Sequence, residues 1–351
     1  MAEKLRVGIS IGDINGIGME VIIKTFLDNR MLEICTPIVY GSSKIASFYR
    51  RVLDIPDFSF NIIKKAEEFN PKRANLVNLW DEEIDIQPGE STSIGGEYAF
   101  KSLKTAVEDL ASGKTDVLIT APINKQNIQS DEFNFTGHTE FLADYANVDN
   151  PLMVLCDEGL RVGLVTGHLP LKEVPSSLNK ELILSKLAVF NKTLKQDFGI
   201  EKPKIAVLGL NPHSGDGGLL GTEEQEIISP AIKQAFDGGV LAMGPYPADG
   251  LFGSSTYQKF DGILAMYHDQ GLAPFKAMAF HKGVNYTAGL PIVRTSPDHG
   301  VGYDIAGQNK ASEQSFRQAV YLACDIYKTR RMNKQLFANS LDAPKEVLEE
   351  V

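Results

Sequence analysis

Three of the six histidines in the sequence stand in the same local context. His168, His213 and His268 each follow a short, apolar, strand-like run by no more than three residues. The runs cover residues 162–166, 205–210 and 263–267. Ligands of open α/β sheets bind outside the carboxyl ends of the strands, where the loops converge. Three neutral imidazoles at that edge could hold a divalent metal ion and leave one position open for substrate or water, as catalytic sites do.

The residues around these histidines also favour a ligand site. Taken alone, each histidine is more commonly a hydrogen-bonded loop residue. However, residues 211–218 have the sequence Asn-Pro-His-Ser-Gly-Asp-Gly-Gly, which is too rich in glycine for a core loop and indicates backbone brought close to a ligand. Asp269 directly follows His268 and could either fix the tautomer of an imidazole or cap a helix. The sequence leaves both roles of Asp269 open.

A predicted helix start could bind an anion. Residues 135–142 have the pattern of a loop that turns into a helix, and His138 and Thr139 fall near its first turn. Free backbone N–H groups and the helix dipole make such a turn a ready anion site. The alternative is ordinary helix capping by Thr136 or Thr139.

Two cations and an amide lie further along the chain. Lys276, Asn285 and Arg294 occur in a stretch rich in glycine and proline, which predicts loops. As single residues they would be ordinary surface groups. Together, and just downstream of a three-histidine site, they could grip a carboxylate or a phosphate.

Two familiar phosphate-binding motifs are incomplete. Residues 112–115 resemble the end of a P-loop, but Glu108 stands where the first glycine belongs, and a predicted helix precedes the motif instead of following it. Residues 12–18 follow a strand as a dinucleotide fingerprint would, but Val21 replaces its third glycine. Neither motif supports a nucleotide site.

The composition of the 351-residue chain is that of a globular protein. With 35 Lys and Arg against 45 Asp and Glu, the formal net charge is -10, so nucleic acid is not an expected partner. Three well-separated cysteines fit a reducing compartment. No stretch approaches the length of about 18 apolar residues that indicates a membrane span, and the start of the chain lacks an apolar leader. We expect a cytoplasmic protein without membrane contact.

The order of the predicted elements indicates the α/β class. Strand-like runs alternate with helical patterns over most of the chain, which favours a largely parallel sheet. The helical patterns include apolar stripes within residues 100–110 and 183–194, a capping box at Thr222 with Gln225, and a last helix over about 312–327. The sequence has no long flexible linker between two domains. The absence of a linker would be explained if the two domains share strands or if the chain crosses between them twice. The predicted strands cover residues 5–11, 36–40, 116–122, 161–166, 204–210 and 261–267.

Several motifs also occur in the order of a known family. They are Gly12–Gly18, Ala121–Pro122 with Lys125, Thr136–Glu140, Thr166–Leu171, Gly209–His213, Gly244–Asp249, Met266–Gly271, Gly289–Ser296 and Asp298–Gly300. From about residue 5 to about residue 330, the sequence resembles the 4-hydroxythreonine-4-phosphate dehydrogenase family of pyridoxal phosphate biosynthesis. Local departures leave the fine substrate and cofactor preference open, and residues 81–95 carry no motif that we can assign. The departures are at Ile14, Asn15, Met19, Leu219 and Gly250.

The resemblance implies a fold similar to the isocitrate and isopropylmalate dehydrogenases. Two α/β/α sandwich domains would enclose the active-site cleft, one made of residues 1–130 plus about 305–351 and the other of about 131–304. The resemblance also implies a homodimer that completes the site across subunits, and binding of NAD or NADP without the usual fingerprint. The residues that bind the cofactor are not identified.

The resemblance assigns roles position by position. His168, His213 and His268 match the family's metal ligands, and the ion could be zinc, magnesium or cobalt. The matched substrate-binding positions are His138, Thr139, Lys276, Asn285 and Arg294. Lys276 is also the candidate for proton transfer, although pairing with the substrate carboxylate is an equal alternative.

The implied reaction is metal-dependent oxidation of 4-phosphohydroxy-L-threonine by NAD(P)+. The resulting β-keto acid would lose CO2 to give 3-amino-2-oxopropyl phosphate. One alternative is a dehydrogenase acting on D-erythronate or D-threonate 4-phosphate, because the same residues would serve a substrate without the amine. A more distant alternative is a three-histidine lyase or phosphohydrolase that uses no nicotinamide. A non-catalytic protein that binds a phosphorylated metabolite is the last alternative.

Overall fold

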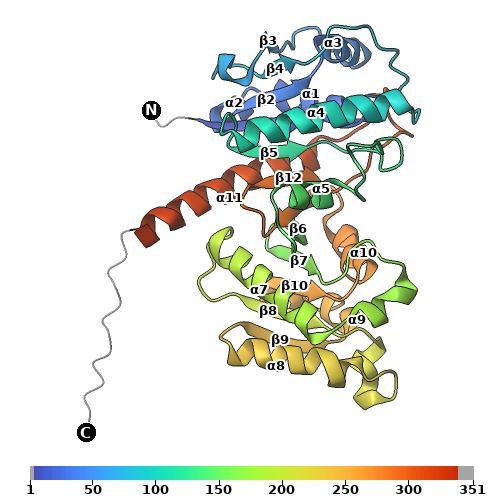
Figure 1. Cartoon of the computed structure of the whole chain (residues 1–351), viewed down its shortest axis with the longest axis vertical. Helices are drawn as coiled ribbons and strands as arrows, with labels where there is room; N and C mark the ends of the chain where they lie inside the picture. The colour runs from blue at the N-terminus through green and yellow to red at the C-terminus, as the bar shows by residue number, and fades with distance from the viewer. Residues whose placement is uncertain (1–3, 339–351) are drawn as a thin grey trace.

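The computed structural model describes residues 4–338, which form a single mixed sheet of twelve strands flanked by helices (Figure 1). The order of the strands across the sheet is β3-β4-β2-β1-β5-β12-β11-β6-β7-β10-β8-β9. The strands are β1 (Leu5–Ser10), β2 (Cys35–Gly41), β3 (Asn61–Ile63), β4 (Asn75–Asn78), β5 (Val117–Thr120), β6 (Leu152–Asp157), β7 (Leu160–Leu164), β8 (Lys204–Leu208), β9 (Leu241–Tyr246), β10 (Gly262–Ala265), β11 (Val284–Ala288) and β12 (Arg294–Pro297).

The predicted α/β class is confirmed, and all six predicted strands are present as β1, β2, β5, β7, β8 and β10. These strands are apolar and buried, as expected for strands covered on both faces. The sheet is parallel except around β6 and β11, which run antiparallel to their neighbours. Because β12 pairs with β5 on one side and β11 on the other, it joins the two halves of the sheet.

Helices cover both faces of the sheet. The longer ones are α1 (Gly18–Leu27), α3 (Ser43–Val52), α4 (Ser93–Ala111), α5 (His138–Tyr145), α7 (Lys180–Gln196), α8 (Ser229–Asp237), α10 (His268–Ala279) and α11 (Gln314–Ala338). Shorter helices are α2 (Met31–Ile34), α6 (Val174–Ser177) and α9 (Ala248–Phe252). None of the helices in residues 4–338 combines the length and the apolar character needed to cross a membrane.

The buried side chains form an α/β/α arrangement in each half. In the half that begins with β1, Leu103 of α4 shares a buried cluster with Leu118 on one face of the sheet. On the other face, Phe26 of α1 and Val320 of α11 share a cluster with Ile119.

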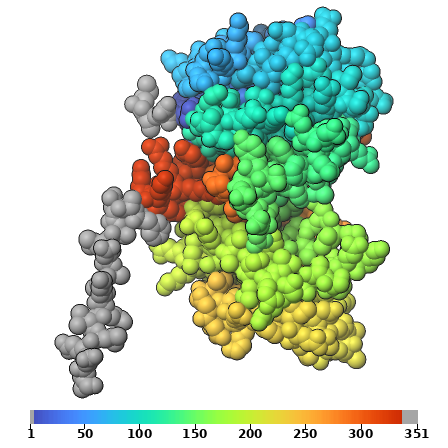
Figure 2. Space-filling view, in the orientation of Figure 1, coloured from blue at the N-terminus to red at the C-terminus, as the bar shows by residue number. Residues whose placement is uncertain are grey.

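The second half repeats this layering. Leu187 of α7 belongs to one cluster with Val207, while Phe275 of α10 belongs to another with Leu208. Figure 2 shows the two halves stacked along the long axis of the molecule, with residues near 140 between them. No observation tests the predicted domain boundaries near residues 130 and 305, and residues 339–351 lie outside the described part of the chain.

The predicted helices are present, but the start of one helix and the end of another differ from the prediction. Both apolar stripes lie on helices, α4 and α7. The helix predicted from Thr222 is present, but it opens with the π-helix η4 (Glu224–Ile228) before continuing as α8, which a capping-box pattern does not predict. The last helix continues to Ala338 instead of ending near Tyr327.

An ion pair between the buried Asp197 and the partly exposed Arg330 fixes α11 against the second half. Arg330 Nε donates to Asp197 Oδ1 at 2.6 Å, just beyond the end of α7. The Tyr286 hydroxyl of β11 donates to Asp197 Oδ2 at 2.5 Å and accepts from Arg330 Nη2 at 2.9 Å. This network therefore holds β11 in place beside Asn285.

We predict that Arg330→Met lowers the free energy of unfolding by about 2 to 4 kcal/mol, because it leaves the Asp197 carboxylate buried without its cation. Urea denaturation measures the change. The double variant Asp197→Asn with Arg330→Met should recover most of the loss, and Arg331→Met, on the exposed side of α11, should change stability by less than about 0.5 kcal/mol. A loss in Arg330→Met no larger than in Arg331→Met would contradict the prediction.

Candidate active site

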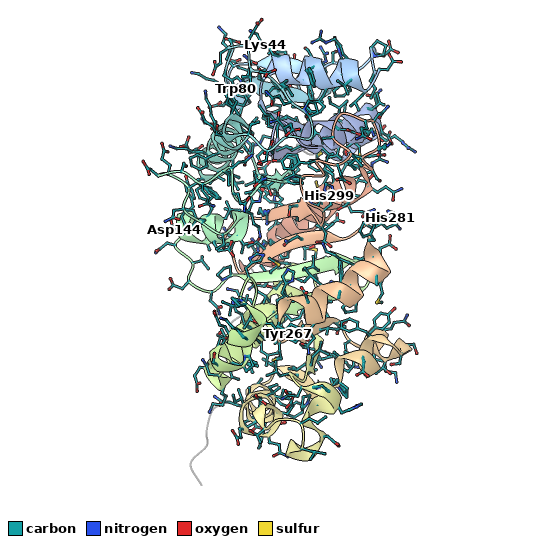
Figure 3. All side chains as sticks on the ribbon, turned by 90° about the vertical axis from the view of Figure 1, so that its right-hand side faces the viewer. Lys44, Trp80, Asp144, Tyr267, His281 and His299 are labelled. Atoms are coloured by element: carbon teal, nitrogen blue, oxygen red, sulfur yellow. The ribbon has the colours of Figure 1, made fainter. Side chains whose placement is uncertain are left out.

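A cavity of about 250 Å³ lies where the two halves of the sheet meet. Its walls come from the carboxyl end of β5, from β11 and β12, and from the first turns of α5 and α10. Figure 3 shows His299, which lines it, near the middle of the long axis of the molecule. Seven of the eight predicted site residues line the cavity: His138, Thr139, His168, His268, Lys276, Asn285 and Arg294.

Arg294 supplies a buried positive charge to this cavity. It is 2% exposed. Its Nε and Nη2 donate to Thr120 Oγ1 at 3.1 and 2.6 Å, and its Nη1 donates to Thr287 Oγ1 at 3.0 Å. Within residues 4–338 it forms no ion pair with a carboxylate. Burial lowers the pKa of Arg294 from its ordinary value, and Glu140 opposes this change only in part. A buried cation that is held only by hydroxyl groups favours an anionic ligand.

The start of α5 faces the same cavity. Gly137 occupies the N-cap position and no side chain caps the helix, so neither Thr136 nor Thr139 acts as the cap. Burial, and then the charges of Arg294 and Lys125, lower the pKa of His138 well below its ordinary value. The imidazole is therefore neutral near pH 7.

Four buried polar atoms of cavity-lining residues have no hydrogen-bond partner among the described residues, and they include Glu140 Oε2 and His299 Nε2. The other two are His138 Nε2 and Asn285 Oδ1. Buried polar atoms are normally satisfied. His138 Nε2 and Asn285 Oδ1 are placed to bind a ligand in the cavity.

Lys276 and Asp298 form the opposite wall. Lys276 Nζ lies 3.5 Å from Asp298 Oδ1 and donates to the Asp298 carbonyl oxygen at 3.3 Å. Burial raises the pKa of Asp298, and the nearby Lys276 lowers it in part. The lysine side chain is 42% exposed and so can reach a bound ligand.

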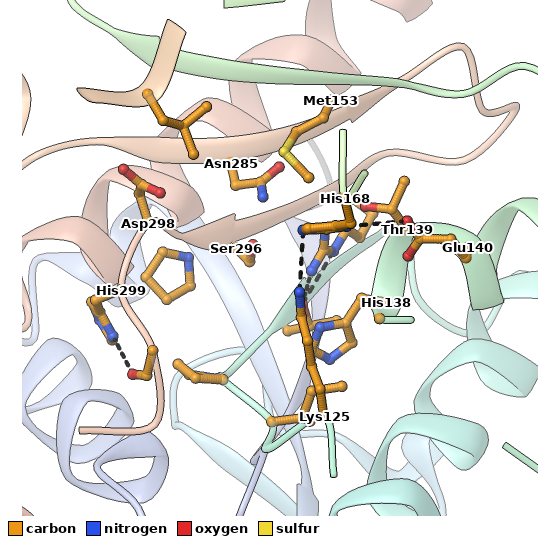
Figure 4. Close-up of a pocket in the computed structure, with 18 of the residues that line it drawn as sticks. Lys125, His138, Thr139, Glu140, Met153, His168, Asn285, Ser296, Asp298 and His299 are labelled. Atoms are coloured by element: carbon orange, nitrogen blue, oxygen red, sulfur yellow. Dashed lines mark hydrogen bonds and ion pairs between the residues drawn. The ribbon is translucent and has the colours of Figure 1, made fainter. Parts of the chain in front are cut away.

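His168 and His268 are placed to share a cation. Their ring centroids are 5.7 Å apart. Two imidazoles that bind one ion through metal–nitrogen bonds of about 2.1 Å have centroids roughly 5 to 6 Å apart. Lys125 Nζ lies 3.1 Å from His168 Nε2 and must leave that nitrogen before an ion can bind to it (Figure 4). The spacing of the two rings fits a divalent metal ion.

Asp269 has the first of its two predicted roles. Its Oδ1 lies 2.6 Å from His268 Nδ1, whereas Tyr267 occupies the N-cap position of α10. A carboxylate only accepts, so Nδ1 carries the proton and Nε2 keeps its lone pair for a ligand. The contact fixes the tautomer of the imidazole.

His213 lies apart from the other two histidines. It is exposed on the loop η3 (Pro212–Gly218) and lines a separate cavity of about 450 Å³ with Tyr267 and Gln270. Residues 4–338 contain no group of three metal-binding side chains within one chain. The three-histidine site therefore remains a prediction, and a single chain brings together only His168 and His268.

The prediction of loops around Lys276, Asn285 and Arg294 is wrong, because Lys276 lies in the last turn of α10. Asn285 lies on β11 and Arg294 begins β12. β11 has the sequence Val-Asn-Tyr-Thr-Ala and alternates apolar and polar residues over only five positions, whereas β12, Arg-Thr-Ser-Pro, has no apolar run. The period-2 pattern that marks a strand is therefore present in β11, but it is short, and it is absent from β12.

Sequence reasoning gave no role to Lys125, Glu140, Asp298 or His299, which also line the cavity. Glu140 Oε1 lies 3.6 Å from His168 Nδ1 (Figure 4). Burial raises the pKa of Glu140, but hydrogen bonds, led by that from His168, lower it overall. The signal was available, because all four residues stand in or beside the motifs that the sequence shares with the family.

Comparisons with known proteins show the family of the chain. The model of the family described as "Pyridoxal phosphate biosynthetic protein PdxA" matches residues 33–323. A 4-hydroxythreonine-4-phosphate dehydrogenase of Bacteroides thetaiotaomicron is 53% identical, over 97% of this chain and 93% of that protein. A protein of Oceanobacillus iheyensis, whose name assigns it provisionally as a D-threonate 4-phosphate dehydrogenase, is 38% identical over 94% of this chain and 100% of its own length.

A solved structure has the same fold. The crystal structure of 4-hydroxythreonine-4-phosphate dehydrogenase from Klebsiella pneumoniae superposes with a TM-score of 0.80 at 34% identity, over 93% of this chain and 98% of that one. Sequence and fold therefore agree over nearly the whole chain. The chain belongs to the PdxA family.

Proposed function

We propose that this protein is a metal-dependent dehydrogenase that oxidises 4-phosphohydroxy-L-threonine with NAD(P)+. Decarboxylation of the product then gives 3-amino-2-oxopropyl phosphate, in a step of pyridoxal 5'-phosphate biosynthesis. The names of the PdxA relatives support this activity. The structural observation that carries it is the buried Arg294, which lines the same small cavity as the His168 and His268 pair.

The charged ends of the substrate find partners in the cavity. Arg294 and the first turn of α5, with His138 and Thr139, hold the phosphate and carboxylate ends. Asn285 Oδ1 is free to accept a hydrogen bond from the substrate. Binding at both ends fixes the hydroxyl carbon between them, which contributes to catalysis through orientation.

The substrate hydroxyl lies toward the histidine pair. A zinc, magnesium or cobalt ion bound there supplies a Lewis acid that lowers the pKa of a coordinated hydroxyl group. His168 and His268 hold the ion together with His213. Asp269 keeps the His268 lone pair on Nε2, as the 2.6 Å contact requires. The nicotinamide cofactor supplies the hydride acceptor.

Lys276 is the catalytic residue of this proposal. Its ammonium group lies beside Asp298 at the wall of the cavity and can pair with the substrate carboxylate or move a proton at the reacting carbon. Burial raises the pKa of Asp298 and the neighbouring Lys276 lowers it in part, while the carboxylate holds the ammonium group at the wall of the cavity.

We further propose that the enzyme is a cytoplasmic homodimer whose site is shared between subunits. All three cysteines are free and buried, as is usual in a reducing compartment. His213 lies outside the cavity that His168 and His268 line, on an exposed loop. A second copy related by twofold symmetry can bring its own His213 to that cavity.

D-threonate 4-phosphate is the second candidate substrate, because the relative from Oceanobacillus iheyensis carries that name. D-erythronate 4-phosphate belongs to the same class. Both have a carboxylate, a phosphate and a hydroxyl group but lack the amine. The residues that line the cavity would hold their common groups in the same way.

We predict that the protein produces reduced nicotinamide when it is mixed with a divalent metal, NAD+ or NADP+ and 4-phosphohydroxy-L-threonine. The absorbance of the reduced nicotinamide measures the reaction. The ratio kcat/KM should exceed that for D-threonate and D-erythronate 4-phosphate at least about tenfold, a difference of about 1.4 kcal/mol in transition-state binding. Reversed preference would favour the second candidate. Consumption of substrate without reduced nicotinamide would instead indicate a lyase or phosphohydrolase and sink the dehydrogenase proposal.

A mixing experiment tests the shared site. His213→Ala and His268→Ala homodimers should each be inactive, because each variant lacks one ligand at every site. After the two are unfolded and refolded together in equal amounts, half of the dimers are mixed and each has one intact site, so we predict about one quarter of the wild-type activity. No recovery, with mixed dimers shown to be present, would mean that all three histidines act within one chain or that the metal assignment fails.

A further inference from the structure

The loop that carries His213 has an unusual backbone. Five consecutive residues, His213 to Gly217, have positive φ angles of 54°, 51°, 80°, 43° and 66°. Three of them bear side chains, for which this left-handed region is unfavourable. Such a run persists only where the surrounding structure holds it in place.

A buried carboxylate holds the start of this loop. Glu224 is 2% exposed. Its Oε1 accepts hydrogen bonds from the backbone N–H groups of Leu210 and Asn211, both at 2.7 Å, and its Oε2 accepts from Asn211 Nδ2 at 3.0 Å. These donors immediately precede Pro212 and His213. No lysine, arginine or histidine within residues 4–338 forms an ion pair with Glu224. The loop itself therefore supplies the hydrogen bonds that stabilise the buried charge.

The glycines of this segment pack against the same carboxylate. A Cβ atom on Gly209 would lie 3.0 Å from Glu224 Oε1, and one on Gly215 would lie 2.7 Å from Oε2. Glu224 also opens the π-helix η4, an irregular turn often found at functional sites. The carboxylate thus contacts the loop on both sides of His213.

We propose that Glu224 is a positioning residue for metal binding: its carboxylate fixes the backbone of residues 210–215 and so sets the position from which His213 reaches the ion. This inference rests on the proposed role of His213 as a metal ligand. Glu224 does not touch the ion. Partners that orient a metal ligand from behind commonly change metal affinity by about 10- to 100-fold when they are lost.

Glutamine is the informative replacement. It keeps the size and shape of the side chain, but one of its two terminal atoms becomes an NH2 group. N–H groups of the loop donate to both Glu224 oxygens. In either orientation of the glutamine amide, its NH2 group therefore faces one of these N–H donors and cannot accept the hydrogen bond. Glu226→Gln makes the same change at an exposed position in the same π-helix and serves as the matched control.

The test is cobalt(II) binding to the metal-stripped full-length protein, followed by calorimetry and by the visible absorption of the bound ion. Glu224→Gln should weaken cobalt binding by at least about tenfold, while Glu226→Gln should bind as the wild type does. In a His213→Ala background, Glu224→Gln should cause no further loss of affinity, because the ligand that it positions is gone. Glu224→Gln should lower the midpoint temperature of thermal unfolding in both backgrounds.

The outcomes separate this inference from the proposed function. If His213→Ala weakens cobalt binding but Glu224→Gln does not, the inference is overturned and the metal site stands. Equal losses from Glu224→Gln in both backgrounds would also overturn it, since they would indicate a general structural role. If His213→Ala binds cobalt as the wild type does, both the inference and the assignment of His213 are overturned.

A second pair of variants tests the inference if Glu224→Gln does not fold. Gly215 and Gly217 have left-handed φ angles of 80° and 66°, so alanine strains the backbone similarly at either position. Only at Gly215 would the new Cβ contact Glu224, whereas at Gly217 it meets nothing within 4 Å. Gly215→Ala should therefore weaken cobalt binding at least about tenfold more than Gly217→Ala. Equal effects would overturn the inference.

Discussion

Arg294 is a cation buried at the centre of the molecule and held only by hydroxyl groups of the described residues. Removing a charge from water is strongly unfavourable unless a partner compensates for it. The main chain of Arg294 cannot move toward solvent, because β12 pairs with β5 on one side and with β11 on the other. The fold therefore holds an unbalanced positive charge at the junction of its two halves. An anionic substrate restores the balance.

The other groups of the cavity are consistent with this constraint. The charges of Arg294 and Lys125 help to keep His138 neutral, and the start of α5 adds further attraction for an anion. The second half contributes the histidine pair proposed to bind the metal ion, His168 and His268, from the carboxyl ends of β7 and β10. One face of the cavity thus suits the charged ends of a phosphorylated acid, and the other suits a metal ion next to its hydroxyl group. Neither half alone carries both.

The sequence predicted most of this arrangement, and its failures have physical causes. Buried strands such as β8 and β10 are apolar runs that need no tertiary information. β11 and β12 are not continuous apolar runs: β11 alternates apolar and polar residues over only five positions, and β12 has no apolar run. The grouping of His213 with the other histidines followed from its place after β8, which is a neighbour of β10 in the sheet, but the left-handed loop η3 carries His213 to a separate cavity. The role of Glu224 was invisible, because it depends on hydrogen bonds to the backbone of another segment.

The central claim is that Arg294 creates a site for a phosphorylated anion, and calorimetric titration of the metal-stripped protein with inorganic phosphate tests it most directly. The account predicts that Arg294→Met binds phosphate at least about 30-fold more weakly than the wild type, or about 2 kcal/mol. Lys233→Met, which removes an exposed cation from α8, should bind within about twofold of the wild type. Equal phosphate affinity of Arg294→Met and the wild-type protein would contradict the account.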